Sequence, residues 1–115
     1  MATPRVVVEL LDALEVEGID ISRIGLHFHN TRNTGLANIM VAMQRGVSRF
    51  DAAIGGLGGC PYSPGATGNV ATEDVVHMVE DLGVTTGIDL EHLIECGQLA
   101  EQLVGRQLPA QVLRS

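Results

Sequence analysis

Hydrophobic residues recur at helical spacing in four stretches of the chain, with two short apolar runs between them. The first stretch opens at Thr3, a good N-cap residue, with Pro4 at the first helical position, where its missing N–H costs nothing. We predict a helix from there to about Gly18, because the apolar side chains fall on one face. These side chains are Val7, Leu10, Leu11 and Leu14.

Three further helices are predicted by the same spacing, over residues 36–46, 72–83 and 89–105. Thr72 and Asp89 are expected to be the N-cap residues of the last two. A glycine ends each of the three segments. The expected inward side chains are Leu36, Ile39, Met40 and Met43, then Val75, Val76, Val79 and Leu82, then Leu90, Leu93, Ile94, Leu103 and Val104.

Residues 24–29 and 48–54 are predicted to be strands, and in the second Phe50, Ala52 and Ile54 share a face. The order of elements is therefore helix, strand, helix, strand, helix, helix. This alternation predicts an α/β fold with a parallel sheet, which places ligands at the carboxyl ends of the strands. Two strands do not make such a sheet, since parallel sheets need covered faces and several neighbours. We expect one domain that is part of something larger.

Two histidines at the end of the first predicted strand are the first candidate site. His27 and His29 lie two residues apart, so both side chains leave the same face, opposite to Leu26 and Phe28. Neutral imidazoles placed in this way can chelate one divalent metal. The alternative is a pair of partly exposed histidines, or one histidine satisfied by a hydrogen bond in the core.

A glycine-rich segment over residues 55–69 is the second candidate site. It holds six of the chain's 14 glycines and two of its four prolines, and it matches neither the P-loop nor the dinucleotide-binding pattern. Cys60 is either a thiol that donates a proton or attacks, or a small apolar filler. Asn69 offers an amide oxygen suited to Mg²⁺ or Mn²⁺, or it is a turn residue beside Gly68.

Four other polar side chains receive structural interpretations. Asp51 points away from Phe50 and is expected to form an ion pair or to support another group, because buried carboxylates need partners. His77 and His92 are expected on exposed helix faces. Cys96 is expected in the core of the last helix.

The charge balance excludes two classes of partner. The chain has 115 residues, with 14 acidic side chains against seven basic ones, which gives a net charge of −7. Nucleic acids and anionic membranes both attract positive charge, so we expect neither as a partner. No apolar run approaches the roughly 20 residues needed to span a bilayer. Two cysteines make no disulfide framework, so we expect a cytoplasmic protein.

Several of these motifs together resemble the hydroxymethylglutaryl-CoA lyase family. The matching segments are His27-Phe28-His29-Asn30-Thr31, Gly35-Leu36-Ala37-Asn38, Gly56-Leu57-Gly58-Gly59-Cys60-Pro61-Tyr62, Gly65-Ala66-Thr67-Gly68-Asn69 and Ala71-Thr72-Glu73-Asp74. The histidine motif alone also fits isopropylmalate synthase and related aldolases. Those relatives generally lack the Cys60 loop, so the resemblance favours the lyases.

The resemblance implies a (β/α)8 barrel with a divalent Mg²⁺ or Mn²⁺ at its C-terminal mouth. Residues 1–115 would be the C-terminal portion of this barrel, from the helix before strand seven to the last helices. His27 and His29 would bind the metal on strand seven, and Asn69 would bind it after strand eight. Cys60 would be the acid–base thiol of a mobile loop, and His27 would share its catalytic role.

The resemblance also implies three substrate or loop residues. These are Gly58 and Gly59 in the loop, and Glu73 near the far end of the loop. The implied reaction cleaves a 3-hydroxy-3-methylacyl-CoA to acetyl-CoA and a 3-oxo acid. Asn30 replaces the usual aspartate, and Ala53-Ile54-Gly55 replaces Ser-Val-Ala, so citramalyl-CoA is a competing substrate.

The family also takes a metal-binding aspartate and a catalytic arginine from its first strand, and these have no counterpart in the chain. We therefore expect an enzyme that is active only with the rest of the barrel, through assembly with the missing part or as a homo-oligomer. Two exposed strand edges and apolar helix faces favour such assembly. The alternative is a catalytically inactive interaction module derived from a lyase.

Overall fold

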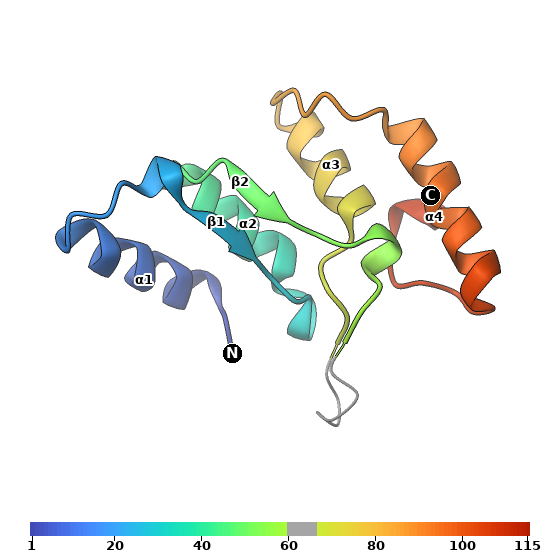
Figure 1. Ribbon diagram of the computed structural model, residues 1–115, viewed down its shortest axis with the longest axis horizontal. Coiled ribbons are helices and arrows are strands. Elements are labelled where there is room, and N and C mark those ends of the chain that lie inside the picture. The colour runs from blue at the N-terminus through green and yellow to red at the C-terminus, as the bar shows by residue number, and fades with distance from the viewer. Residues whose placement is uncertain (60–66) are drawn as a thin grey trace. The chain divides into compact units, whose positions relative to one another are not determined.

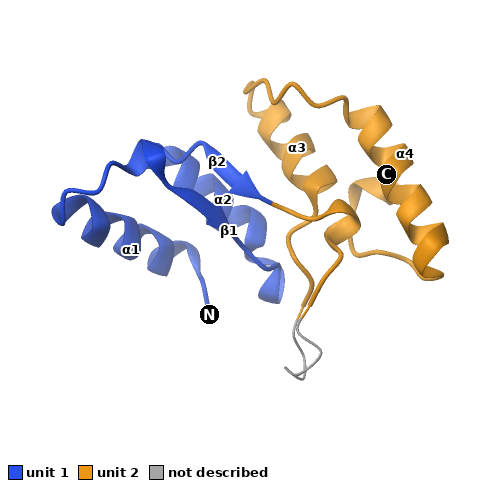
Figure 2. Ribbon diagram, viewed as in Figure 1, with its two compact units in different colours: residues 1–51 blue, residues 52–115 orange. Residues whose placement is uncertain are grey.

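The computed structural model describes residues 1–59 and 67–115 of the chain (Figure 1). The chain divides into two compact units, residues 1–51 and residues 52–115 (Figure 2). The boundary falls directly after the second strand. Cys60 lies outside the described residues.

Unit 1 alternates helices and strands, as predicted. Its main elements are α1 (Pro4–Val16), β1 (Gly25–His27), α2 (Gly35–Gln44) and β2 (Arg49–Asp51). β1 and β2 pair in parallel (Figure 1). Both strands are shorter than predicted, because the backbone enters short 3₁₀ helices soon after each, at Thr31–Asn33 and Ile54–Gly56.

The register of the two strands decides which side chains share a face. Gly25 lies opposite Arg49, Leu26 opposite Phe50, and His27 opposite Asp51. Burial alternates along both strands, with the middle residue of each half-buried and the outer residues exposed. The face that carries His27 and Asp51 is therefore open in unit 1, as the alternation of side chains predicts.

The core of unit 1 lies between its two helices and the strands. Its buried apolar side chains are Val7, Leu11, Ile21, Phe28, Ile39, Ala42 and Val47. Thr3 caps α1 by accepting a hydrogen bond from the Val6 N–H at 3.4 Å, as predicted. Thr34 and the buried Asn38 both donate to the Ala2 carbonyl, which fixes the start of α1 against α2.

Unit 2 is built on α3 (Thr72–Asp81) and α4 (Leu90–Val104), with a 3₁₀ helix at Val112–Arg114. Asp89 caps α4 as predicted, because its Oδ1 accepts a hydrogen bond from the backbone N–H of His92 at 3.2 Å. Thr72 is not the N-cap of α3 but its first residue. The N-cap is Ala71, because Ala53 and Ala71 form a parallel bridge in which the Thr72 N–H donates to the Ala53 carbonyl at 2.9 Å.

The predictions of inward side chains were partly wrong. Leu10, Leu82, Leu103 and Val104 are exposed, and so is Cys96, which was expected in the core. Helical spacing fixes which side chains share a face, but it does not say whether another element covers that face. In α4 the buried residue is Gly97, so this helix packs closely along its glycine side.

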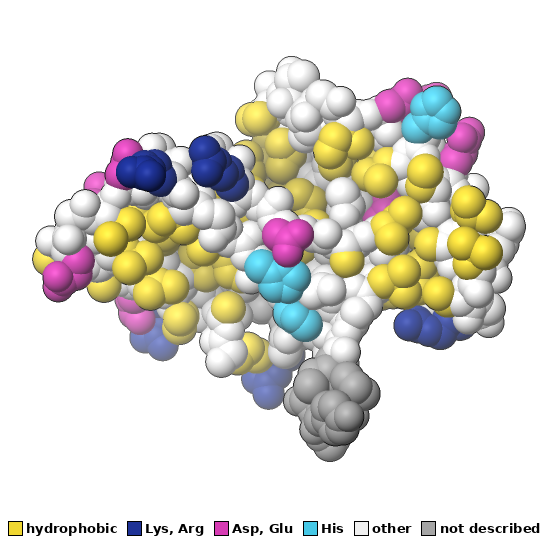
Figure 3. Space-filling view, viewed as in Figure 1, with side chains coloured by type: hydrophobic (Ala, Val, Ile, Leu, Met, Phe, Trp, Pro, Cys, Tyr) yellow, Lys and Arg dark blue, Asp and Glu magenta, His cyan; other side chains and the backbone are white. Residues whose placement is uncertain are grey.

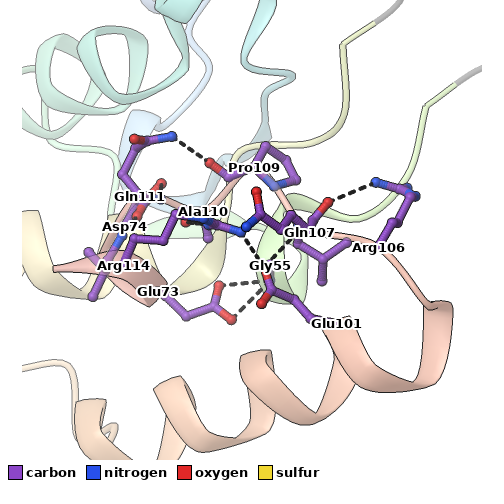
Figure 4. A network of polar contacts seen from close by, with 12 residues as sticks. Gly55, Glu73, Asp74, Glu101, Arg106, Gln107, Pro109, Ala110, Gln111 and Arg114 are labelled. Atoms are coloured by element: carbon purple, nitrogen blue, oxygen red, sulfur yellow. Dashed lines mark hydrogen bonds and ion pairs between the residues drawn. The ribbon is translucent and has the colours of Figure 1, made fainter.

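The C-terminal segment is fixed to both helices of unit 2 by carboxylates (Figure 4). Asp74 of α3 accepts from the backbone N–H groups of Gln111 and Val112 at 3.1 and 2.9 Å. Glu101 of α4 accepts from the Leu108 N–H at 2.8 Å and pairs with Arg114. The Leu108 bond, with Arg114 adding to it, lowers the pKa of Glu101.

We predict that Gly97→Ala destabilises the protein by about 1–3 kcal/mol, although alanine favours a helix by about 1 kcal/mol. A methyl group at Gly97 would lie 2.5 Å from Glu73 Oε1 and 2.6 Å from Leu113 Cδ2. The carboxylate is buried and cannot move away without breaking hydrogen bonds. Urea unfolding of the complete native protein measures the change.

Gln98→Ala on the same helix is the control, because Gln98 is exposed and its replacement removes no buried contact. We expect it to change the free energy of unfolding by less than about 0.5 kcal/mol. A Gly97→Ala protein as stable as the wild type would show that α4 is not held closely against Glu73.

Candidate functional site

His27 and His29 lie together at the carboxyl end of β1, as predicted. Their ring centroids are 5.3 Å apart, with an angle of 79° between the ring planes. Both residues are exposed, and the open face beside His27 contains a pocket of about 260 Å³ whose lining includes Gly25, Arg49 and Asp51. Figure 3 shows histidine and acidic side chains side by side on the visible face.

Asp51 has the partner that the sequence predicts for it, and this partner is His27. Asp51 Oδ2 lies 2.9 Å from His27 Nδ1, because the two residues are opposite each other in the sheet. A carboxylate only accepts hydrogen bonds, so a neutral His27 in this pair carries its proton on Nδ1. The Nε2 lone pair is then the one available to a ligand.

The backbone after His29 turns sharply into α2. Arg32 and Asn33 have positive φ angles of 53° and 60°, in the left-handed region. Asn30 Oδ1 accepts from the N–H of Gly35, the first residue of α2, at 3.0 Å. The histidine pair is therefore held between the end of a strand and a hydrogen-bonded turn.

Asn69 is held in unit 2 by the other side of the glycine-rich segment. Its Nδ2 donates to the Leu57 carbonyl at 2.8 Å. Gly58, with a φ of 102°, is the close neighbour of this amide, and a Cβ there would lie 2.4 Å from Asn69 Nδ2. Gly59 is exposed. The two ends of the segment thus meet at Asn69.

Glu73 is fully buried, and its carboxylate reaches the start of the glycine-rich segment rather than only its far end. Both oxygens accept from the Gly55 N–H, at 2.9 and 2.8 Å (Figure 4). Burial raises the pKa of Glu73, and the backbone N–H groups of Glu73 and Gly55 offset part of that rise. This contact fixes the start of the glycine-rich segment to α3. No sequence signal indicated this partner.

Each unit therefore gathers part of the predicted site. Unit 1 brings together His27, His29 and Asp51, and unit 2 brings together Gly58 and Asn69. Over residues 1–59 and 67–115 there is no cluster of three or more histidine, cysteine or acidic side chains that could hold a metal ion. His77 and His92 are exposed, as predicted.

Comparison with known proteins identifies the family. The sequence matches the family described as HMGL-like over residues 1–100, and the chain belongs to this family. It is 44% identical over 113 residues to the hydroxymethylglutaryl-CoA lyase YngG of Bacillus subtilis, covering 98% of this chain and 38% of that protein. It is 49% identical over 112 residues to the (R)-citramalyl-CoA lyase of Chloroflexus aurantiacus, covering 97% and 35%.

A solved structure shows the same fold. The HMG-CoA lyase from Acinetobacter baumannii, in complex with coenzyme A and 3-methylmalate, matches with a TM-score of 0.91 and 45% identity, covering all of this chain and 37% of that one. The chain thus spans little more than a third of the length of these relatives. The predicted fold class, an α/β portion of a (β/α)8 barrel, is confirmed.

In the described part of the chain, no helix is both long enough and apolar enough to cross a membrane.

We predict that the stability of the wild type relative to Glu73→Gln falls as the pH rises above about 4.5, the ordinary pKa of glutamate. The pKa of Glu73 is higher in the folded state than in the unfolded state. The native protein then binds more protons than the unfolded chain, and that advantage is lost as the pH passes the raised pKa. Urea unfolding at several values from about pH 4 to pH 7 measures the difference between the two proteins.

The comparison with Glu73→Gln cancels the titration of the other carboxylates, which both proteins share. Asp20→Asn is the matched control, because Asp20 is exposed and caps a short turn far along the sequence from Glu73. A relative stability of the wild type that increases over this pH range would contradict a raised pKa.

Proposed function

We propose that this chain forms the metal-binding and loop portion of a carbon–carbon lyase that cleaves a branched 3-hydroxyacyl-CoA. The candidate substrates are 3-hydroxy-3-methylglutaryl-CoA and citramalyl-CoA, and the products are acetyl-CoA and an oxo acid. The observation that supports this proposal most directly is the pair of adjacent imidazoles at the end of β1, with the Nδ1 atom of His27 bonded to Asp51. The relatives named above are lyases for both substrates.

The ligand atoms fit the divalent metal that the family implies. His27 and His29 would hold Mg²⁺ or Mn²⁺ through neutral ring nitrogens, and Asn69 would add its amide oxygen. Such ligands carry no charge, so a bound ion would keep its positive charge for polarising the oxygens of the substrate. The hydrogen bond from Asn69 Nδ2 to the Leu57 carbonyl supports this role, because it restrains the amide.

The reaction needs one proton removed and one proton supplied. A general base of the complete enzyme accepts the proton of the tertiary hydroxyl, whose oxygen forms the new carbonyl as the carbon–carbon bond breaks, and the electron pair of that bond passes to the enolate of acetyl-CoA. Protonation of that enolate completes the cleavage. We assign this proton to Cys60, which lies outside the described residues. A thiol can supply this proton as a general acid.

The chain is proposed to work with the rest of the barrel. Its two-stranded sheet leaves the face of His27 and Asp51 exposed, and neighbouring strands of a barrel would cover such a face. We expect the assembled enzyme in the cytoplasm, as a homo-oligomer or joined to the missing portion.

We predict that His29→Ala and Cys60→Ser each lower kcat/KM of the complete native protein by about 100-fold or more. The first variant loses a proposed metal ligand, and the second loses the proposed proton donor. Release of acetyl-CoA is measured from each of the two candidate substrates, with Mg²⁺ or Mn²⁺ and after treatment with a chelator. The chelator is expected to abolish cleavage.

Two matched controls test whether the losses are specific. His92→Ala removes an exposed histidine of α4, and Cys96→Ser removes an exposed free thiol of the same helix. Both are expected to keep activity within about twofold of the wild type. Unchanged cleavage in His29→Ala and Cys60→Ser would refute the roles assigned to these two residues. A complete wild type that cleaves neither substrate, and whose assembly both variants retain, would instead be the inactive interaction module.

A further inference from the structure

We propose that Asp51 is the positioning residue of the metal site: it holds the His27 ring with its proton on Nδ1, so that Nε2 faces the metal. This inference rests on the proposed function, because it concerns a ligand of the proposed metal. Asp51 would act through His27 and would touch neither the metal nor the substrate.

The parallel sheet places the two residues together without help from any loop. His27 and Asp51 are the last paired residues of β1 and β2, and their Cα atoms are partners in the register. Because side chains alternate along a strand, opposite residues point to the same face. The resulting separation of 2.9 Å between Nδ1 and Oδ2 is that of a charge-assisted hydrogen bond.

Fixing the proton matters because a neutral histidine binds a metal only through the nitrogen that lacks one. An unrestrained ring can carry its proton on either nitrogen and can rotate about its side-chain bonds. Asp51 accepts at Nδ1 and thereby removes both freedoms. Histidine ligands of metals commonly donate their other N–H to a carboxylate in this way, and loss of that partner typically weakens metal binding 10- to 100-fold.

A contribution to folding does not account for the pair equally well. The side chains of His27 and Asp51 are 42% and 78% exposed, and ion pairs this exposed add little stability. The His27 ring also lies in a T-shaped arrangement with the His29 ring, with 5.3 Å between the centroids. The proposed metal site accounts for this orientation.

The test compares Asp51→Asn with the wild type in the complete native protein. Asparagine has nearly the same shape, but its amide can donate to Nδ1 and let the His27 proton move to Nε2. Nitrogen-15 NMR of the metal-free protein at about pH 8, where an ordinary imidazole is neutral, reports which nitrogen carries the proton. Titration with Mn²⁺ alone gives the dissociation constant.

We expect the His27 proton on Nδ1 in the wild type and a detectable population on Nε2 in Asp51→Asn. The Kd for Mn²⁺ should rise 10- to 100-fold. In a His27→Ala background, Asp51→Asn should add no further loss, which separates positioning from a simple loss of negative charge. Asp89→Asn is the matched control, since Asp89 faces His92 at 3.3 Å on the exposed surface of α4 and should leave the Kd unchanged.

Either of two results would overturn the role of Asp51. One is an unexpected position of the His27 proton: on Nε2 in the wild type, or at the same nitrogen in Asp51→Asn as in the wild type. The other is an equal loss of Mn²⁺ affinity from Asp51→Asn whether or not His27 is present. A wild type that binds no Mn²⁺ refutes the proposed function instead, and the metal-free NMR comparison still decides whether Asp51 sets the His27 proton.

Discussion

One buried carboxylate organises unit 2. Glu73 projects from the first turn of α3, bonds the Gly55 N–H with both oxygens, and leaves room beside it only for a glycine on α4. Burying a charged group is costly unless its oxygens are satisfied, so Gly55 must stay within reach of α3. The Gly55 carbonyl in turn accepts from Ala110, which draws in the C-terminal segment. The start of the glycine-rich segment is thereby fixed to the body of the unit.

The side chains of His27 and Asn69, two candidate ligands, are both held by a hydrogen bond. In each, the polar atom that would not bind the metal already has a partner: His27 Nδ1 is bonded to Asp51, and Asn69 Nδ2 is bonded to the Leu57 carbonyl. The remaining atom, Nε2 or Oδ1, is the one suited to a cation. The orientation of both side chains is thus set by hydrogen bonds within each unit.

Local signals in the sequence predicted much of this arrangement. Thr3 and Asp89 cap their helices, and the spacing of His27 and His29 placed both rings at one strand end. The failures concern partners that are distant in sequence. Nothing local shows that Glu73 bonds a residue 18 positions earlier, or that Cys96 lies on an uncovered side of α4. Such facts depend on which elements meet, and spacing along one element does not determine that.

The core and the site of unit 1 depend on a single alignment of two strands. Phe50 and Asp51 are neighbours on opposite faces of β2, so one registers with the apolar Leu26 and the other with His27. A one-residue insertion between the strands that slid β2 by one position would turn the carboxylate inward and Phe50 outward. A two-residue slide would keep the faces but separate Asp51 from His27. Changes in chain length between the strands are therefore tolerated only where the α2 connection absorbs them without moving β2.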